Sequence, residues 1–230
     1  MKLLKTGTIA CVAVGLALAV AHADTLIDEN FESGKADTGK EMTLSKPGST
    51  HVKVSPENPK DGKFSLRFED HDSQEKRSWE PSASFRFTEQ FPEAKLRVSF
   101  DCYLDSGENP MFTVELGSSH GNGKWRLLRL ILNSPNLFVP TTGKSLGSPV
   151  DTSLAPGAWH RIVIDCSASR QAGGFSVTVD GVERGSVPYW AVEPDEEGFP
   201  VDRLSIMDDG NGDDVVYIDN VKVESFSSIH

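Results

Sequence analysis

Short segments in which apolar and polar residues alternate recur along most of the chain, and this pattern constrains the fold more than any other feature. The clearest segment runs from residue 96 to 104, where apolar side chains stand at every second position: Leu96, Val98, Phe100, Cys102 and Leu104. A period of two places these residues on one face of a β-strand. The segment is therefore predicted to be a strand with one buried face.

Comparable strand candidates follow one another along the chain, with turn residues between them. They span residues 26–32, 52–54, 64–68, 82–87, 111–116, 124–132, 159–166, 175–179, 204–207 and 215–223. Asp180-Gly181 separates two alternating runs, which is a strong signal for a β-hairpin. Convincing helical periodicity is absent, and 20 Gly and 13 Pro supply the turns. The pattern therefore predicts an all-β protein built as an antiparallel sandwich.

The last strand candidate, residues 215–223, changes phase in its middle. Val216 and Ile218 share one face of an extended ribbon, whereas Val221 and Val223 fall on the other. The apolar face can continue along the strand only if one residue is bulged near Asp219. The sequence therefore predicts a β-bulge that places a carboxylate at a kink.

Three short segments resemble the secreted jelly-roll carbohydrate-binding modules, which belong to the wider group of concanavalin A-like and laminin-G-like sandwiches. They are the Phe-Glu pair at residues 31–32, the Gly-Lys-Phe-Ser-Leu-Arg segment at 62–67 and the Tyr-Ile-Asp-Asn-Val segment at 217–221. The resemblance implies an antiparallel two-sheet β-sandwich of jelly-roll (concanavalin A-like) type. It also implies that the first and last strands lie side by side.

In modules of this kind the first and last strands often share a structural Ca²⁺. By resemblance, its ligands in this chain are the carboxylates of Glu32 and Asp219 and the backbone carbonyl of Lys63. The acidic segment 208–214 also has the spacing that begins a helix-loop-helix calcium loop, but Asp214 stands where such a loop needs Gly. We expect segment 208–214 to be a hairpin loop instead.

The first 23 residues have the features of a signal peptide. A short basic start is followed by apolar residues from 9 to 20 and by Ala21-His22-Ala23, a small-x-small cleavage site. The apolar run is shorter than the ~20 residues that span a membrane. We therefore expect a signal peptide at residues 1–23 and a single β-sandwich domain at 24–230. The mature protein is expected to be secreted, to the periplasm or the extracellular space, without membrane insertion.

The expected mature chain is strongly acidic. Removal of Lys2 and Lys5 leaves 21 basic residues (23 minus 2) against 34 acidic ones, a formal net charge of −13. Electrostatic attraction to nucleic acids or to anionic bilayers is therefore not expected.

Two cysteines remain in the expected mature chain, Cys102 and Cys166. Each shares the inward phase of its strand candidate, and export exposes the chain to an oxidising compartment. A cross-strand disulfide between them would close a loop of 64 residues (166 minus 102). By the chain-entropy relation it would contribute roughly 4 kcal/mol to stability.

One acidic segment matches a catalytic motif on paper. Residues 193–197, Glu-Pro-Asp-Glu-Glu, fit the Glu-x-Asp-x-Glu pattern of laminarinase-type retaining glucanases. Pro194 cannot donate to a β-ladder, and the acids have no apolar residues between them, which favours an acidic surface loop. Polysaccharide lyases of similar fold use an Arg or Gln with His and Tyr, and the His and Tyr residues here show no common motif. We assign no catalytic residue.

Aromatic residues are the remaining candidates for ligand binding, because sugars stack their C–H faces on exposed rings while polar neighbours read the hydroxyls. The candidate ligand-binding residues are Trp79, Trp125, Tyr189 and Trp190, with Arg129 as a polar neighbour. Trp159 is expected in the core. Arg126 is predicted to point away from Arg129, so that only one of the two can serve a given face.

The sequence as a whole predicts an exported carbohydrate-binding module that recognises an extracellular polysaccharide without cleaving it and carries a structural calcium. Two alternatives stay open at this point, because the same sandwich hosts several functions. The first is a polysaccharide lyase or retaining glucanase. The second is a cell-surface adhesion or structural module whose ligand is a protein.

Overall fold

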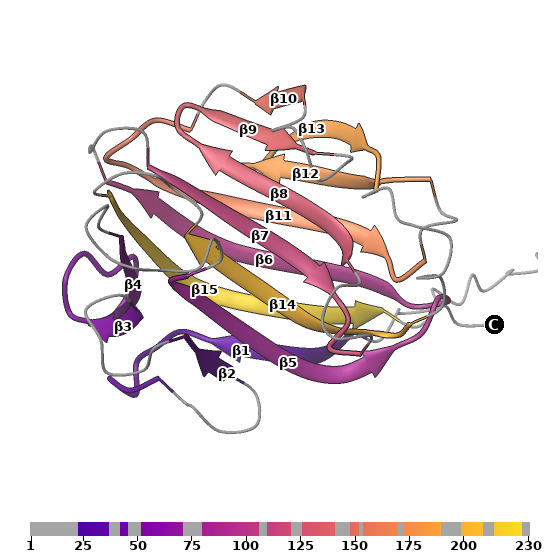
Figure 1. Ribbon diagram of the computed structural model, residues 1–230, viewed down its shortest axis with the longest axis horizontal. Coiled ribbons are helices and arrows are strands. Elements are labelled where there is room, and N and C mark those ends of the chain that lie inside the picture. The colour runs from indigo at the N-terminus through magenta and orange to yellow at the C-terminus, as the bar shows by residue number, and fades with distance from the viewer. Residues whose placement is uncertain are drawn as a thin grey trace, which may run out of the picture.

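The computed structural model describes residues 23–36, 42–45, 52–70, 80–105, 110–120, 126–140, 148–151, 154–169, 173–189, 199–208 and 214–226. In these ranges the chain forms β-strands and loops, and two antiparallel sheets pack face to face (Figure 1). The predicted antiparallel two-sheet β-sandwich of jelly-roll type is confirmed. Residues 1–22 of the expected signal peptide lie outside the described ranges.

Sheet 1 is centred on β6 and β15. Within the described residues its order is β13 (Val182–Val187), β12 (Phe175–Val179), β11 (Trp159–Ser167), β6 (Lys95–Leu104), β15 (Asp214–Phe226), β4 (Ser65–Asp70) and β3 (Val52–Ser55). β1 (Ala23–Glu29) also pairs with β15, off this path. The first and last strands therefore lie side by side, as the resemblance implied.

Sheet 2 covers the other side of the core. Its order in the described part of the chain is β10 (Ser148–Asp151), β9 (Asn136–Val139), β8 (Arg126–Asn133), β7 (Met111–Gly117), β14 (Val201–Asp208), β5 (Ser82–Gln90) and β2 (Met42–Leu44). In Figure 1 this sheet lies in front of sheet 1, with β5, β14, β7 and β8 as its long central strands.

The predicted bulge in the last strand is confirmed. The register of β15 on β6 shifts between Asp219 and Lys222, and Asn220 has a positive φ of 50°. Ile218 and Val221, on either side of the bulge, are both fully buried. The extra residue restores the inward face, as the phase change in the sequence required.

The hairpin at Asp180-Gly181 is also confirmed. The two residues have φ values of 49° and 79°, and Val179 pairs with Val182 across the turn. Positive φ at both turn residues matches the right-handed twist of the strands, and Asp and Gly tolerate it better than other residues.

The expected hairpin at residues 208–214 is wrong. β14 ends at Asp208 in sheet 2, whereas β15 begins at Asp214 in sheet 1. The segment therefore passes from one sheet to the other. Alternation shows that two segments are strands, but it does not show that they pair with each other.

The core lies between the sheets and consists of the inward residues of both. Its largest fully buried side chains include Phe31, Phe68, Phe85, Phe100, Phe112, Phe175, Leu66, Leu96 and Leu104. Phe100 of β6 and Phe112 of β7 meet edge to face, with ring centroids 6.3 Å apart. Such a pair contributes about 1 kcal/mol beyond its buried area and joins the two sheets at their centres.

The expected disulfide is wrong, because both Cys102 and Cys166 are free and buried. On the ladder between β6 and β11, Cys102 lies opposite His160 and Cys166 lies opposite Leu96. The two cysteines are thus six residues apart along neighbouring strands, which is about 20 Å and far beyond the reach of a disulfide. Burial raises the pKa of both thiols. Their shared phase places them on one face but does not set their register.

No helix in the described residues is long and apolar enough to cross a membrane.

Candidate functional site

The outer face of sheet 2 carries a cluster of arginines, which we call the arginine face. It comprises Arg86 of β5, Arg203 of β14, Glu115 of β7, and Arg126 and Arg129 of β8. Arg86 lies directly opposite Arg203, and Glu115 lies opposite Arg129. Inward neighbours such as Phe85, Leu204 and Leu116 are buried in the core. The alternation of each strand therefore turns these charged side chains outward.

Glu115 is the centre of this face. Although it points away from the intersheet core, the residue is only 6% exposed. Its Oε1 accepts a hydrogen bond of 2.6 Å from Nε of Arg126 and lies 3.4 Å from Nε of Arg129. A buried carboxylate is stable only when it is paired, so Glu115 fixes the positions of both guanidinium groups.

A second bulge explains why two arginines of β8 share one carboxylate. The pairing of β7 with β8 shifts between Leu116 and Gly117, so that Gly117 lies opposite Arg126. The extra residue is Leu127, which is buried beside Leu128. The prediction that Arg126 points away from Arg129 is therefore wrong. The inserted residue moves the side chains that precede it in the strand to the opposite face of the sheet.

Burial and several neighbouring charges act together on Arg203. Burial lowers its pKa, the charges of Glu115 and Asp202 act in the opposite direction, and the charges of Arg126 and Arg86 lower it further. An arginine keeps its charge at neutral pH even so. Its guanidinium is thus a partly buried cation close to both acidic and basic side chains. Such a group binds an incoming anion more strongly than a solvated one does.

The residues expected to hold calcium do come together, at the loop before β4. Oε1 of Glu32 accepts hydrogen bonds from the backbone N–H groups of Lys63 and Phe64, at 2.8 and 3.0 Å. Oδ2 of Asp219 accepts from the N–H of Lys60 at 3.0 Å. Both carboxylates therefore hold the same loop, but N–H donors face them where a calcium site would need oxygen ligands.

Calcium binding at this loop stays a prediction. An ion that binds only the folded state, at a hundredfold excess over its dissociation constant, would raise stability by about 2.7 kcal/mol. We then expect a higher melting temperature in calcium than in chelator, and we expect Asp219→Ala to abolish the difference. Equal melting of the wild type in calcium and in chelator would contradict the prediction.

The predicted aromatic ligand-binding residues are only partly described. Trp79, Trp125 and Trp190 lie outside the described ranges. Tyr189 is buried at 7% exposure, and its ring packs against Phe175 with centroids 5.7 Å apart. Its hydroxyl donates to the carbonyl of Ser167, and burial raises its pKa to about 12. The expectation that Tyr189 presents an exposed ring is therefore wrong, because the ring is part of the buried core.

Trp159 differs from expectation in the opposite sense. It is half-buried on the outer face of sheet 1, beside Tyr103 on β6, at a centroid distance of 5.7 Å. Tyr103 in turn meets Tyr217 of β15 at 5.9 Å, with the rings at 76° to each other. The first pair is tilted at 53° and the second packs edge to face, so the three rings do not form a flat platform for a sugar.

The described residues give little support to the lyase and glucanase alternatives. The segment 193–197 lies outside them. Of the histidines that the structure describes, His160 is buried and bonded to Asp180 on sheet 1, and His120 follows the end of β7. Among the described positions of the arginine face there is no His or Tyr to act as base or acid.

The sequence matches no family profile, and no curated protein matches it. Solved structures are similar to this chain in fold. A sialidase matches 86% of this chain at 15% identity and a TM-score of 0.61, and the match spans only 18% of the sialidase. An endo-β-1,4-glucuronan lyase from the fungus Trichoderma reesei matches 85% of this chain and 94% of its own, at 15% identity and a TM-score of 0.59. An alginate lyase of polysaccharide lyase family 7 matches 86% and 99%, at 14% and 0.56. These likenesses establish a jelly-roll sandwich of the kind found in carbohydrate-active proteins.

Sequence reasoning found Arg129 but missed Arg86 and Arg203. A signal for Arg86 was present, since it alternates with Phe85 and Phe87 and so must face outward. The proximity of Arg86 to Arg203 could not be predicted from the sequence. The two lie 116 residues apart in the chain (203 minus 86, less 1), and only the pairing of β5 with β14 brings them together.

Proposed function

We propose that this protein binds an acidic, uronate-containing polysaccharide through the arginine face and does not cleave it. The observation that carries the proposal is the placement of four arginines, Arg86, Arg203, Arg126 and Arg129, on neighbouring strands of one outward face that holds the buried carboxylate of Glu115. The arginine face thus has four guanidinium groups and one carboxylate, a local excess of positive charge on a chain whose formal net charge is −11. The carboxylates of an acidic polysaccharide are attracted to a face of this charge.

The geometry suits a polymer better than a small anion. Guanidinium groups bind carboxylates through two parallel hydrogen bonds. The arginines stand on β5, β14 and β8, and β7 lies between the last two. With neighbouring strands ~4.8 Å apart, the four strands extend the face over about 14 Å. One chain with regularly spaced carboxylates can therefore meet several guanidinium groups at once.

A further observation supports the proposal. The glucuronan lyase and the alginate lyase that share this fold are named for polymers of uronic acids. Trp125 stays a candidate for ring stacking on the bound sugar. Trp79 and Trp190 stay candidates for the same role.

The test is binding to a polyuronate such as alginate, compared with a neutral glucan. Arg203→Ala is expected to weaken polyuronate binding by at least about thirtyfold, which corresponds to the ~2 kcal/mol of an interface hot spot. Binding should also weaken with salt, because solvated charges are screened. Affinity electrophoresis or calorimetry measures both effects, and the melting temperature shows whether the variant is folded.

Arg97→Ala is the matched control. Arg97 is an exposed arginine on the outer face of sheet 1, paired to Asp165 at 2.7 Å, and its loss should leave binding unchanged. Equal loss in the two variants, or equal retention on neutral and acidic polymers, would contradict the proposal. Release of unsaturated products, seen by their ultraviolet absorbance, would favour the lyase. Release of reducing ends by the wild type that disappears in Glu193→Gln would favour the glucanase. If no polysaccharide is retained or cleaved, the adhesion module is favoured.

A further inference from the structure

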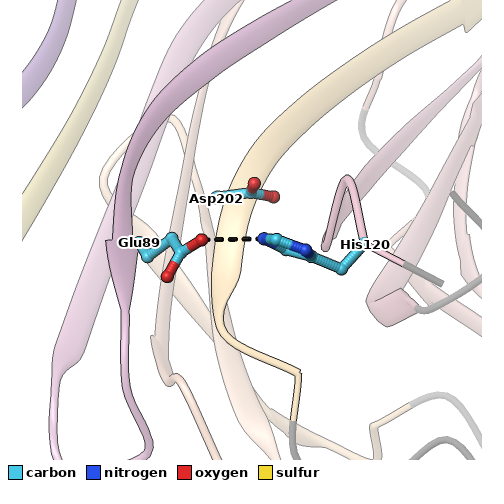
Figure 2. A group of neighbouring side chains, drawn as sticks. All are labelled: Glu89, His120 and Asp202. Atoms are coloured by element: carbon cyan, nitrogen blue, oxygen red, sulfur yellow. Dashed lines mark hydrogen bonds and ion pairs between the residues drawn. The ribbon is translucent and has the colours of Figure 1, made fainter.

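Three adjacent strand ends of sheet 2 bring together Glu89, His120 and Asp202. β5 and β7 finish at the same end of the sheet at which β14 begins, because β14 is antiparallel to both. Glu89 lies near the end of β5, Asp202 is the second residue of β14, and His120 follows β7 by three residues. Figure 2 shows the three side chains reaching one point from these separate segments. Their ligand atoms all lie within 4.8 Å of one another.

A local irregularity of the sheet creates this meeting point. Val201 pairs with Gln90 but Arg203 pairs with Arg86, so Asp202 faces the three residues 87–89. By the alternation of β14, Asp202 shares the inward phase of Leu204 and not the outward phase of Arg203. The cluster therefore lies at the end of the sandwich where β5 and β7 finish and β14 begins. Its residues are not those of the arginine face.

The side chains are held in place by their neighbours. Asp202 is 7% exposed, and its Oδ1 accepts the N–H of Ser119 at 2.6 Å. The hydroxyl of Ser119 donates to Oδ2 of the same carboxylate. Since a carboxylate has about four acceptor sites, roughly half of those on Asp202 remain for another partner. The contact also fixes the residue after Ser119, which is His120.

The imidazole of His120 is oriented as well. Its ring lies parallel to that of Phe199, at an interplanar angle of 3° and a centroid distance of 6.4 Å. Its Nε2 lies 2.7 Å from Oε1 of Glu89, as the dashed line in Figure 2 marks. The side chains of His120 and Glu89 are 48% and 44% exposed. One side of the cluster is thus open to solvent, so that an ion can enter.

We propose that Glu89, His120 and Asp202 bind a divalent transition-metal ion, with Zn²⁺ as the best fit. An imidazole nitrogen favours zinc and its neighbours over calcium and magnesium, which prefer oxygen ligands alone. Two carboxylates balance the charge of the ion. Zinc bound by three protein ligands keeps an open position for water or a substrate group.

The observed distances need only a small adjustment for zinc. Ligand atoms about 2.1 Å from a tetrahedral zinc are about 3.4 Å from one another, so the cluster must contract by little more than an ångström at its widest. Rotation of the exposed Glu89 and His120 side chains can supply this movement, while Asp202 stays held by Ser119. The ion then takes the place of the proton between His120 and Glu89.

The test is a calorimetric titration of untagged, chelator-treated protein with Zn²⁺, together with metal analysis of the dialysed product. We expect one zinc per chain, binding at least a hundredfold more tightly than Ca²⁺ or Mg²⁺. His120→Ala, Glu89→Gln and Asp202→Asn should each weaken binding at least tenfold. Ser119→Ala keeps every ligand but loses the support of Asp202, and should cost about tenfold.

The matched control is Asp180→Asn, which removes the carboxylate from the other histidine–carboxylate pair of the described chain, His160 with Asp180 at 2.7 Å. Zinc affinity should be unchanged in this variant. Bound Co²⁺ should show the visible absorption typical of a low coordination number, and this absorption should be lost in His120→Ala. Zinc that binds His120→Ala as well as the wild type, or an equal loss in Asp180→Asn, would overturn the proposal.

Discussion

Gly62→Ala is expected to destabilise the protein by about 3 kcal/mol. Gly62 has a φ of +67°, and a methyl group on its Cα would come within 2.5 Å of the Glu32 carboxylate. A left-handed conformation costs an alanine roughly 1–2 kcal/mol. Glu32 must also turn away, which breaks its hydrogen bonds to the N–H groups of Lys63 and Phe64, at about 1 kcal/mol or more for the pair in this exposed position.

Two further variants separate these contributions. Gly181 has a φ of +79°, and no atom lies within 4 Å of the position that a Cβ would take, so Gly181→Ala should lose only the conformational part, about 1 kcal/mol. In a Glu32→Ala background, Gly62→Ala should also cost only that part, because the two residues then no longer collide. Urea unfolding measures all four variants. Equal losses for Gly62→Ala and Gly181→Ala would show that Glu32 does not hold the loop.

Arg161→Ala is expected to cost about 2 to 3 kcal/mol of stability at neutral pH. The guanidinium of Arg161 lies on the outer face of sheet 1, where it donates to Asp101 at 3.0 Å, to the carbonyl of Asn220 at 3.3 Å and to Ser99 at 2.9 Å. Asp101 is 5% exposed and Asp219 is fully buried. Breaking a buried pair costs about 3–5 kcal/mol. The Arg161 side chain is 38% exposed, so water reduces the loss.

The loss should shrink when the pH is lowered. Burial raises the pKa of Asp219 above its ordinary value of 3.8, the surrounding backbone N–H groups lower it, and the charge of Asp101 raises it further. A carboxyl with a raised pKa in the folded state favours folding below its ordinary pKa, and this contribution is lost as the pH rises through the raised value. Without Arg161, the charge of Asp101 is no longer compensated, so that protonation of Asp219 stabilises the folded state more. The deficit of Arg161→Ala should therefore be smaller at about pH 4.5 than at about pH 7.5.

Arg97→Ala is the control for this prediction too. Arg97 and Asp165 form an exposed pair, with side chains 47% and 39% exposed, and such pairs contribute about 0–1 kcal/mol. Its removal should have only a small effect at either pH. A deficit of Arg161→Ala that equals that of Arg97→Ala, or that grows as the pH falls, would contradict the role given to the buried acids.

The all-β class, most strands and the bulge at Asp219 could be predicted from the residues alone. This was possible because alternation is a local property: a strand with one buried face must show a period of two, and an interrupted period requires an inserted residue. The turn at Asp180-Gly181 was readable for the same reason, since only a few residue types accept positive φ. The resemblance added the pairing of β1 with β15.

Which strands are neighbours could not be predicted without the folded structure, and the candidate sites depend on those neighbours. The arginine face requires β5, β14, β7 and β8 to lie side by side in a fixed register. The meeting of Glu89, His120 and Asp202 requires three strand ends to coincide. The predicted disulfide between Cys102 and Cys166 was wrong for the same reason, because the register of β6 on β11 could not be predicted from the sequence. Contacts between distant segments depend on packing and strand-pairing energies summed over whole sheets. The alternation of residues within one strand therefore does not show which distant strand pairs with it.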